Sequence, residues 1–223
     1  MRYYPINLDL EDRPCLVVGG GAVGTRKVKT LLDCAARVTV VSPQWSATLS
    51  ALAGTRGLTL QRRGYRRSDL DGVHLVFAAA SDPAVNRRVK IDAHEAGVLC
   101  NLAQRPQDGD FILPSLVRQG DLVLSISTSG ASPALAKHLR QRLETQFGPE
   151  YAMLLRLLKA VRRHLIDAGH DPDGHRRLLV RLVDGPLLEW LKSGDMTAVD
   201  ELLERELGLS GGLDRLMALT PDD

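Results

Sequence analysis

The sequence predicts an α/β domain followed by a region made of helices. Between Pro14 and Ala103, short apolar runs rich in β-branched residues alternate with stretches in which apolar residues recur every three or four positions. The first pattern is typical of buried strands and the second of amphipathic helices. From Glu150 onward only the helical spacing remains. Strands that alternate with helices indicate a parallel sheet with helices on both of its faces.

The individual elements follow from the same patterns. Strands are expected at 15–18, 38–41, 58–60, 74–80 and 98–102, and helices at 23–34, 44–53 and 83–96. Asp82 and Pro83 suit the N-cap and first position of the last of these helices. One further strand, 122–127, precedes a helix over 134–146 that is capped by Ser132. After a helix from 150 come a loop at 169–174, helices at 177–183, 186–192 and 197–207, and a loose tail around Gly211-Gly212 and Pro221–Asp223.

Composition narrows the class of protein. With 44% hydrophobic and 25% charged residues, the 223-residue chain can bury a core, which excludes disorder as its main state. No apolar run is long enough to span a membrane, and the N-terminus lacks the layout of a signal peptide. Three widely spaced cysteines, Cys15, Cys34 and Cys100, indicate reduced thiols and a cytoplasmic location. A net charge of +2 and 4% aromatic residues argue against a nucleic-acid partner.

A glycine-rich turn follows the first predicted strand and opens the first predicted helix. Gly19, Gly21 and Gly24 fit the G-x-G-x-x-G pattern of dinucleotide-binding proteins. In that pattern the first glycine permits the tight turn, the second lets the backbone approach a pyrophosphate, and the third lets the helix pack on the strand. The N–H groups around Ala22 and Val23 would then hold the phosphates. The alternative is a glycine turn with no ligand.

The end of the second strand bears on which dinucleotide is bound. An NAD site usually has an acidic residue about 20 residues after the glycines, yet this strand ends without one. Ser42 can supply one hydrogen bond to the ribose, and Pro43 and Gln44 can line the adenosine. Because no arginine follows the strand to meet a 2′-phosphate, we expect NAD rather than NADP. Ala80 and Asp82, after the fourth strand, are expected to complete the cofactor site.

A set of short segments along residues 1–147 resembles one known family. These segments are Pro5-Ile6, 15–24, Arg26-Lys27, 79–86, 100–102, 111–115 and 127–136. They resemble the precorrin-2 dehydrogenases, which are the N-terminal module of siroheme synthases and its stand-alone relatives. The resemblance is strongest at 111–115. Beyond residue 150 only the helical character is shared.

The resemblance implies a fold, an activity and a partner. The fold is an NAD-binding Rossmann domain at 1–113, a small strand-helix dimerisation segment at 114–147, and an all-helical C-terminal domain at 148–223. The activity is the NAD-dependent oxidation of precorrin-2 to sirohydrochlorin by a homodimer, and many members also act as lyases that insert ferrous iron. Since the sequence stops at Asp223, we expect the stand-alone form. Neither a nucleic acid nor a membrane is expected as a partner.

The candidate acid/base residues follow the Cys100-Asn101 pair. In the family a carboxylate in this segment is implicated in dehydrogenation and chelation, but its position is held here by Gln104, which cannot take a proton. Asp108 and Asp110 can substitute, or they can be solvated loop acids. Ferrochelatase activity is therefore left open. The histidines form no cluster at zinc spacing, and the loop carrying His170 and His175 is interpreted as polar surface, so no metal site is expected.

The substrate carries many carboxylates, which helix N-termini can bind. The expected substrate-binding residues are Asn101, Ser127, Thr128, Ser129, Gly130, Ser132 and Lys137. All but the first lie between the end of the last predicted strand and the first turns of the following helix, where plain N-capping by Ser132 is the alternative role. Two other functions stay open: a non-catalytic NAD-binding regulatory module, and a tetrapyrrole carrier that has lost its chemistry.

Overall fold

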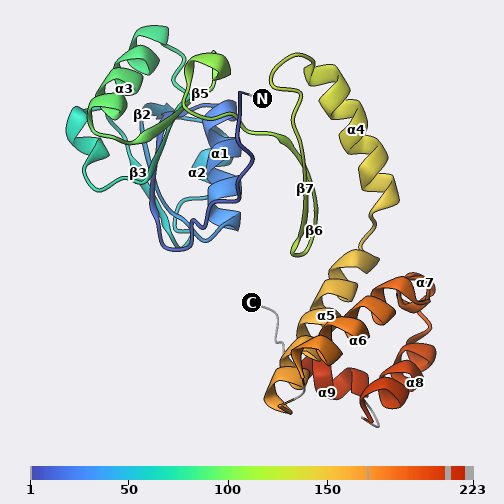
Figure 1. Cartoon of the computed structure of the whole chain (residues 1–223). Coiled ribbons are helices and arrows are strands. Elements are labelled where there is room, and N and C mark those ends of the chain that lie inside the picture. Colours follow the sequence, from blue (N-terminus) through green and yellow to red (C-terminus); the bar gives the residue numbers. More distant parts are fainter. Residues whose placement is uncertain (1, 170, 209–211, 219–223) are drawn as a thin grey trace. The chain divides into compact units, whose positions relative to one another are not determined.

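The structure is a computed structural model, and it describes residues 2–169, 171–208 and 212–218. The chain divides into two compact units (Figure 1). The first holds the residues up to 113 together with 129–131, and the second holds 114–128 and the residues from 132 onward.

The first unit is built on a five-stranded parallel sheet. Its strands are β1 (Pro14–Gly20), β2 (Arg37–Trp45), β3 (Leu58–Gln61), β4 (Leu75–Ala78) and β5 (Leu99–Leu102). They lie in the order β3-β2-β1-β4-β5, and every pair is parallel. The chain winds outward from β1 to β3 and then crosses to β4 on the other side of β1. Ligands of open α/β sheets bind at such a switch point, outside the carboxyl ends of the strands. The predicted Rossmann-type α/β fold is confirmed.

Helices cover both faces of this sheet. The helices are α1 (Ala22–Asp33), α2 (Ala47–Ser50) and α3 (Pro83–Glu95), with short turns η1 (Arg67–Leu70) and η2 (Pro106–Asp108). Val17 and Val28 belong to the core under α1, whereas Leu16 and Val89 belong to the core under α3. In Figure 1 these two helices lie on opposite sides of the sheet. Burial on both faces explains why the strands are almost continuously apolar.

The predicted helix at 44–53 begins later and is shorter than expected. Strand β2 continues to Trp45, and α2 starts only at Ala47. The reason is Ser46, whose hydroxyl accepts a hydrogen bond from the N–H of Leu49 and so caps the helix. The N–H of Ser46 donates to the carbonyl oxygen of Gly20 at 2.8 Å, which ties this point of the chain to the glycine turn.

The second unit begins with a hairpin where a single strand was predicted. Strand β6 (Ser115–Gln119) pairs antiparallel with β7 (Leu122–Ile126), and α4 (Pro133–Gln146) follows. The turn is made at Gly120, whose φ is +57°. Strand β6 was not predicted, because its five residues mix apolar and polar side chains instead of forming an apolar run. The strand-helix segment predicted from the resemblance is therefore a hairpin and a helix.

The rest of the second unit is helical. Its helices are α5 (Glu150–Asp167), α6 (Pro172–Asp184), α7 (Leu187–Ser193), α8 (Met196–Leu207) and α9 (Gly212–Ala218), which share one apolar core. Helix α6 starts within the predicted loop at 169–174, because the carboxylate of Asp171 accepts from the N–H of Gly174 as an N-cap. His170, Gly211 and Pro221–Asp223, part of that loop and of the predicted tail, lie outside the described residues. Gly212, also predicted in the tail, instead begins α9. Of the described helices, none is both long and apolar enough to cross a membrane.

Candidate active site

The glycine turn between β1 and α1 needs glycine at two positions for packing and leaves the third open. Gly19 has a φ of +123°, and a Cβ there would lie 2.3 Å from the carbonyl oxygen of Ala79. A Cβ on Gly24 would lie 2.1 Å from the carbonyl oxygen of Gly19, so the helix packs directly on the turn. At Gly21, apart from the residue itself, its two neighbours and the adjoining helix backbone, no heavy atom of the described residues lies within 4 Å of the Cβ position. The turn is thus rigid on its protein side and open at Gly21.

The open position lies at the start of α1. Gly21 is the N-cap of this helix, and no acidic residue stands in its first turn. Ala22 and Val23 are both exposed. The first N–H groups of a helix have no partner within it, and they carry the positive end of the helix dipole. These donors beside an open glycine fit the pyrophosphate of a dinucleotide.

A hydroxyl pair joins the glycine turn to the end of β2. Thr25 is 4% exposed, and its hydroxyl donates to the carbonyl oxygen of Gly21 at 2.9 Å. The same hydroxyl oxygen lies 3.0 Å from the hydroxyl of Ser46. Sequence reasoning missed both residues, although a small hydroxyl residue one turn into the helix was a readable signal. This pair fixes the ends of β1 and β2 relative to each other.

At the end of β2, the hydroxyl of Ser42 was expected to donate a hydrogen bond to the ribose, but it is engaged within the protein. This residue is buried, and its hydroxyl donates to the carbonyl oxygen of Gln44 at 2.7 Å. The Ser42 proton is therefore used inside the strand end, while Pro43 and Gln44 are exposed. The guanidinium carbon of Arg62, which follows β3, lies 4.6 Å from the ring centroid of Trp45. Tertiary structure thus brings a cation to the end of β2 that the order of the sequence did not place there.

The loop after β4 lies over the glycine turn and is held by one buried amide. The Asn86 side chain, 4% exposed, accepts from the N–H of Ala80 and donates to its carbonyl oxygen, both at 2.9 Å. The carboxylate of Asp82 accepts from the N–H of Ala84, so Asp82 acts as the predicted N-cap of α3. Asp82 is thereby engaged at the helix start. Asn86 is a supporting residue that sequence reasoning did not single out.

Beyond β5, Gln104 and Asn101 have different roles. Gln104 is exposed, and its Nε2 donates to the carbonyl oxygens of Ala80 and Ser81 at 3.3 and 3.4 Å. Asn101 is 3% exposed, and its Nδ2 donates to the carbonyl oxygen of Phe111 at 2.9 Å. Gln104 thus joins the loops of the site, whereas Asn101, predicted to bind substrate, fastens the returning chain to the sheet.

The two candidate acids lie in different surroundings. Lys90 donates to Oδ1 of Asp110, and the N–H of Cys100 donates to Oδ2 at 2.8 Å. Burial alone would raise the pKa of Asp110, but these hydrogen bonds outweigh it and hold the pKa below its usual value. Asp108 is exposed on η2, with its Oδ2 3.8 Å from Nη1 of Arg105. Asp110 is therefore a structural anion, and Asp108 is the more available carboxylate.

The turn before α4 is shaped by its own hydrogen bonds. The N–H of Ser132 donates to the hydroxyl of Thr128 at 3.2 Å, and that hydroxyl donates back to the carbonyl oxygen of Ser132. Ser132 caps α4 by accepting from the N–H of Leu135. Ser129 and Gly130 both have positive φ values, and Lys137 is exposed on the helix. N-capping is therefore present, and binding of substrate carboxylates by this turn, including Ser127, stays a prediction.

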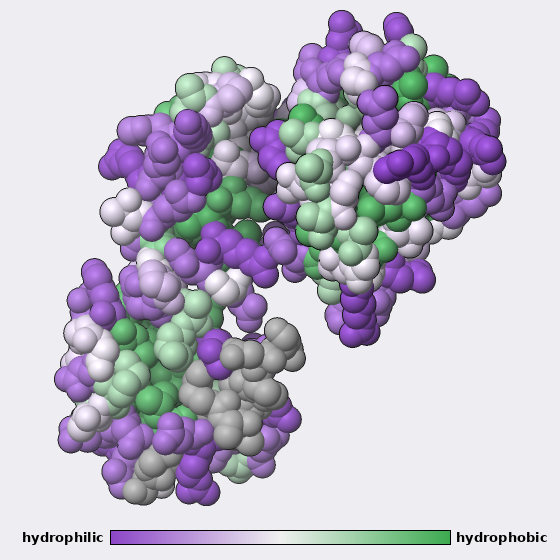
Figure 2. Space-filling model, turned by 180° about the vertical axis from the view of Figure 1, so that it is seen from behind, coloured by the Kyte–Doolittle hydropathy of each residue, from purple (hydrophilic) through white to green (hydrophobic). Residues whose placement is uncertain are grey.

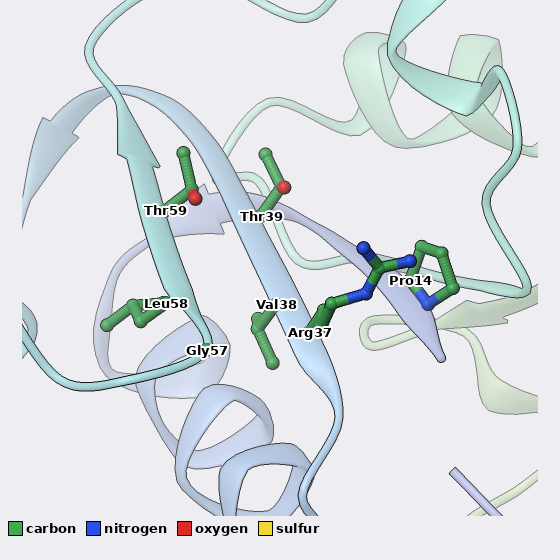
Figure 3. A pocket seen from close by; sticks show the side chains of 7 residues that line it. All are labelled: Pro14, Arg37, Val38, Thr39, Gly57, Leu58 and Thr59. Atoms are coloured by element: carbon green, nitrogen blue, oxygen red, sulfur yellow. The ribbon is translucent and has the colours of Figure 1, made fainter. Parts of the chain in front are cut away.

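A cavity of about 310 Å³ lies at the opposite edge of the sheet, near the amino ends of β1, β2 and β3. It is lined by Pro14, Arg37, Val38, Thr39, Gly57, Leu58 and Thr59, and Figure 3 shows Arg37 beside Pro14. The Nε of Arg37 donates to the carbonyl oxygen of Asp12. None of the predicted site residues lines it. In the described part of the chain, no three His, Cys, Asp or Glu side chains come together as metal ligands.

Comparisons with known proteins agree with this geometry. A family model described as NAD(P)-binding matches residues 6–115, so this region is a nicotinamide-dinucleotide-binding domain. A model described as sirohaem biosynthesis protein central matches 119–146. The siroheme synthase of Thioalkalivibrio sulfidiphilus is 37% identical over 214 residues, which are 96% of this chain and 43% of that protein. That of Methylococcus capsulatus is 36% identical over 203 residues, 91% of this chain and 43% of the relative.

The chain therefore spans less than half the length of these curated relatives. A solved structure named SirC, precorrin-2 dehydrogenase, is matched more completely. It superposes with a TM-score of 0.74 at 32% identity, and the match covers 83% of this chain and 92% of SirC. Because nearly all of SirC is matched in fold and in sequence, the chain belongs to the precorrin-2 dehydrogenase family.

Proposed function

We propose that this protein oxidises precorrin-2 to sirohydrochlorin and that NAD accepts the hydride. The observation that carries the proposal is the open Gly21 at the uncapped start of α1, beside the switch point between β1 and β4. This is where a dinucleotide binds in such a sheet. The likeness to SirC supports precorrin-2 as the substrate.

The residues of the chain mainly bind and orient. The N–H groups at the start of α1 would hold the pyrophosphate, and the loops after β4 and β5 would border the nicotinamide end. When bound, the cofactor supplies the acceptor for the hydride. The substrate also loses one proton, which passes to water or to a base. Gln104 has no group that accepts it, and Asp110 is ion-paired. Asp108 is then the candidate base in this loop.

The preference for NAD over NADP rests on the end of β2. No arginine stands at the end of this strand or directly after it in the sequence, and Ser42 and Gln44 are the uncharged polar side chains there. The guanidinium of Arg62, which lies over the Trp45 ring, is a cation at this strand end that could instead bind the 2′-phosphate of NADP. Calorimetric titration with both cofactors tests it. Tighter binding of NADP that is lost in Arg62→Ala would overturn the preference.

A homodimer built through the segment 114–147 is the second part of the proposal. Leu116 and Val123 are 42% and 48% exposed on the hairpin, and Leu135 on α4 is 49% exposed. Figure 2 shows hydrophobic surface on this part of the molecule between hydrophilic margins. The exposed face of the hairpin carries Leu116 and Val123 beside Arg118 and Ser125, and a two-stranded hairpin is marginally stable alone. A second copy of the chain would cover it. The division into domains at 1–113, 114–147 and 148–223 stays a prediction, since most of the last two segments belong to one compact unit.

The experiment is an anaerobic incubation of the protein with precorrin-2, with and without NAD, followed by its visible spectrum. NAD-dependent formation of sirohydrochlorin is the expected result. Tight binding of the tetrapyrrole without turnover would favour the carrier, and NAD binding without tetrapyrrole binding would favour the regulatory module. In a second assay we expect ferrous iron to enter purified sirohydrochlorin at little above the uncatalysed rate, because Gln104 cannot accept the pyrrole protons.

A further inference from the structure

The side chain of Gln104 bridges two loops that belong to neighbouring strands. Strands β4 and β5 are adjacent and parallel, so the loops after them leave the sheet at the same edge. The Nε2 of Gln104, in the loop after β5, lies 3.3 Å from the carbonyl oxygen of Ala80 and 3.4 Å from that of Ser81. Both acceptors belong to the loop after β4. A single amide group thus connects the two loops from the solvent side.

The loop that Gln104 holds is itself a wall of the glycine turn. A Cβ on Gly19 would lie 2.7 Å from the nitrogen of Ala80, which shows how closely the two segments approach. Asn86 holds the same Ala80 from the buried side through two hydrogen bonds of 2.9 Å. Ala80 is therefore fixed between a buried amide and an exposed one. A shift of this residue would change the space beside the glycine turn.

The bridge requires a hydrogen-bond donor at position 104. Two carbonyl oxygens face the side chain, and an amide NH₂ carries two donors. An ionised carboxylate only accepts hydrogen bonds, so it would be repelled by both carbonyl oxygens. An ionised acidic residue at this position could not form the contact. The glutamine is thus suited to a different task from the proton transfer expected of a carboxylate there.

We propose that Gln104 is a positioning residue that holds the loop after β4 against the glycine turn and thereby raises the affinity for the dinucleotide. This inference rests on the proposed function, because it concerns the cofactor of that reaction. Gln104 acts through the Ala80 loop and takes no part in proton transfer. Its loss should weaken cofactor binding while the rate of the bound complex stays nearly unchanged.

The test measures NAD affinity by calorimetry for the full chain and three variants. Gln104→Glu keeps the size of the side chain but replaces the donor by a charge, and Gln104→Ala removes the bridge. Gln107→Glu is the matched control, because Gln107 is exposed in the same loop and would bear the same new charge. We expect about tenfold weaker binding in Gln104→Glu, about threefold in Gln104→Ala, and no change in the control.

The pH dependence separates positioning from a general loss of structure. In the Gln104→Glu variant, protonation of the introduced carboxylate restores an O–H donor for the carbonyl oxygens. The NAD affinity of this variant relative to wild type should therefore recover as the pH falls from about 8 towards 5. Neither Gln104→Ala nor the control should show this recovery. In turnover assays the KM for NAD should rise in Gln104→Glu, with kcat within about twofold of wild type.

Unchanged NAD affinity in both Gln104 variants would overturn the inference. A collapse of kcat with unchanged affinity would do the same, since Gln104 would then act in the chemistry. If the wild type binds NAD but leaves precorrin-2 unchanged, the proposed function fails while the affinity measurements still decide the role of Gln104. If the wild type does not bind NAD, both proposals are overturned.

Discussion

The five-stranded sheet and the β6–β7 hairpin show two ways in which strands of this chain are covered. All four residues of β4 are buried, because helices of the same unit pack on both faces of its sheet. In the hairpin, every residue of which is described, only Val117 is buried, and alternate residues such as Leu116 and Val123 are exposed. A sheet covered by its own chain can form a rigid binding edge. A hairpin with one bare face needs another surface.

The largest effect on stability is expected at Gly19, where the glycine turn packs against the loop after β4. Gly19→Ala should lower the free energy of unfolding by about 3 kcal/mol, because the residue has a φ of +123° and a Cβ would lie 2.3 Å from the carbonyl oxygen of Ala79. Thermal and urea unfolding measure this change. A variant as stable as wild type would show that the backbone at this edge of the sheet can shift to accommodate a Cβ. The sheet edge would then not be the rigid part of the molecule.

Gly21→Asp should leave the stability of the fold nearly unchanged but greatly weaken the binding of NAD. Its side chain would enter open space, so the melting temperature should change by no more than about 2 °C. The carboxylate would stand where the pyrophosphate is proposed to bind, and we expect NAD affinity to fall by about 100-fold. Calorimetry measures it, with Gly64→Asp as the control, because Gly64 also has open space at its Cβ position and no positive φ. Unchanged affinity would mean that the turn does not bind the dinucleotide.

The hairpin is tested by making its bare face polar. The double variant Leu116→Ser, Val123→Ser should weaken self-association by about tenfold, because two exposed apolar side chains would be lost from the proposed dimer interface. Analytical ultracentrifugation at several concentrations measures this. Val180→Ser with Val183→Ser, two exposed valines on α6, is the matched control. A wild type that stays monomeric at micromolar concentration would contradict the proposed dimer.

The smallest effect concerns Asp110, at the β5 edge of the sheet. Its pKa is lowered in the folded protein, so its stabilisation is present above the unfolded pKa and is lost as the pH falls through the folded one. Asp110→Asn should therefore cost about 1 kcal/mol between pH 5 and 8 and less below about pH 4. Urea unfolding across this range checks the prediction. A difference that grows on acidification would contradict it.

Much of the first unit could be predicted from sequence because its signals are local. Five strands and the helices α1 and α3 follow from hydrophobic period, and the glycine turn and the Asp82 cap follow from residue types at fixed spacing. The hairpin strand β6 could not be found in this way, because a strand with one exposed face has no apolar run. The start of α6 was missed because a cap by Asp171 inside a polar segment resembles a loop.

The sequence by itself predicted most of the elements in their order, the place proposed for the dinucleotide site, and the family, since period, glycine spacing and short segments carry that information. Only the tertiary structure decided what the polar side chains of the site do. Ser42 donates to its own strand end, Asn101 holds the returning chain, and Asp110 pairs with Lys90. Thr25, Asn86 and Gln104 were assigned their roles by contacts across loops. The physical reason is that a hydrogen-bond partner far along the chain is chosen by packing, and no local pattern of residues records that choice.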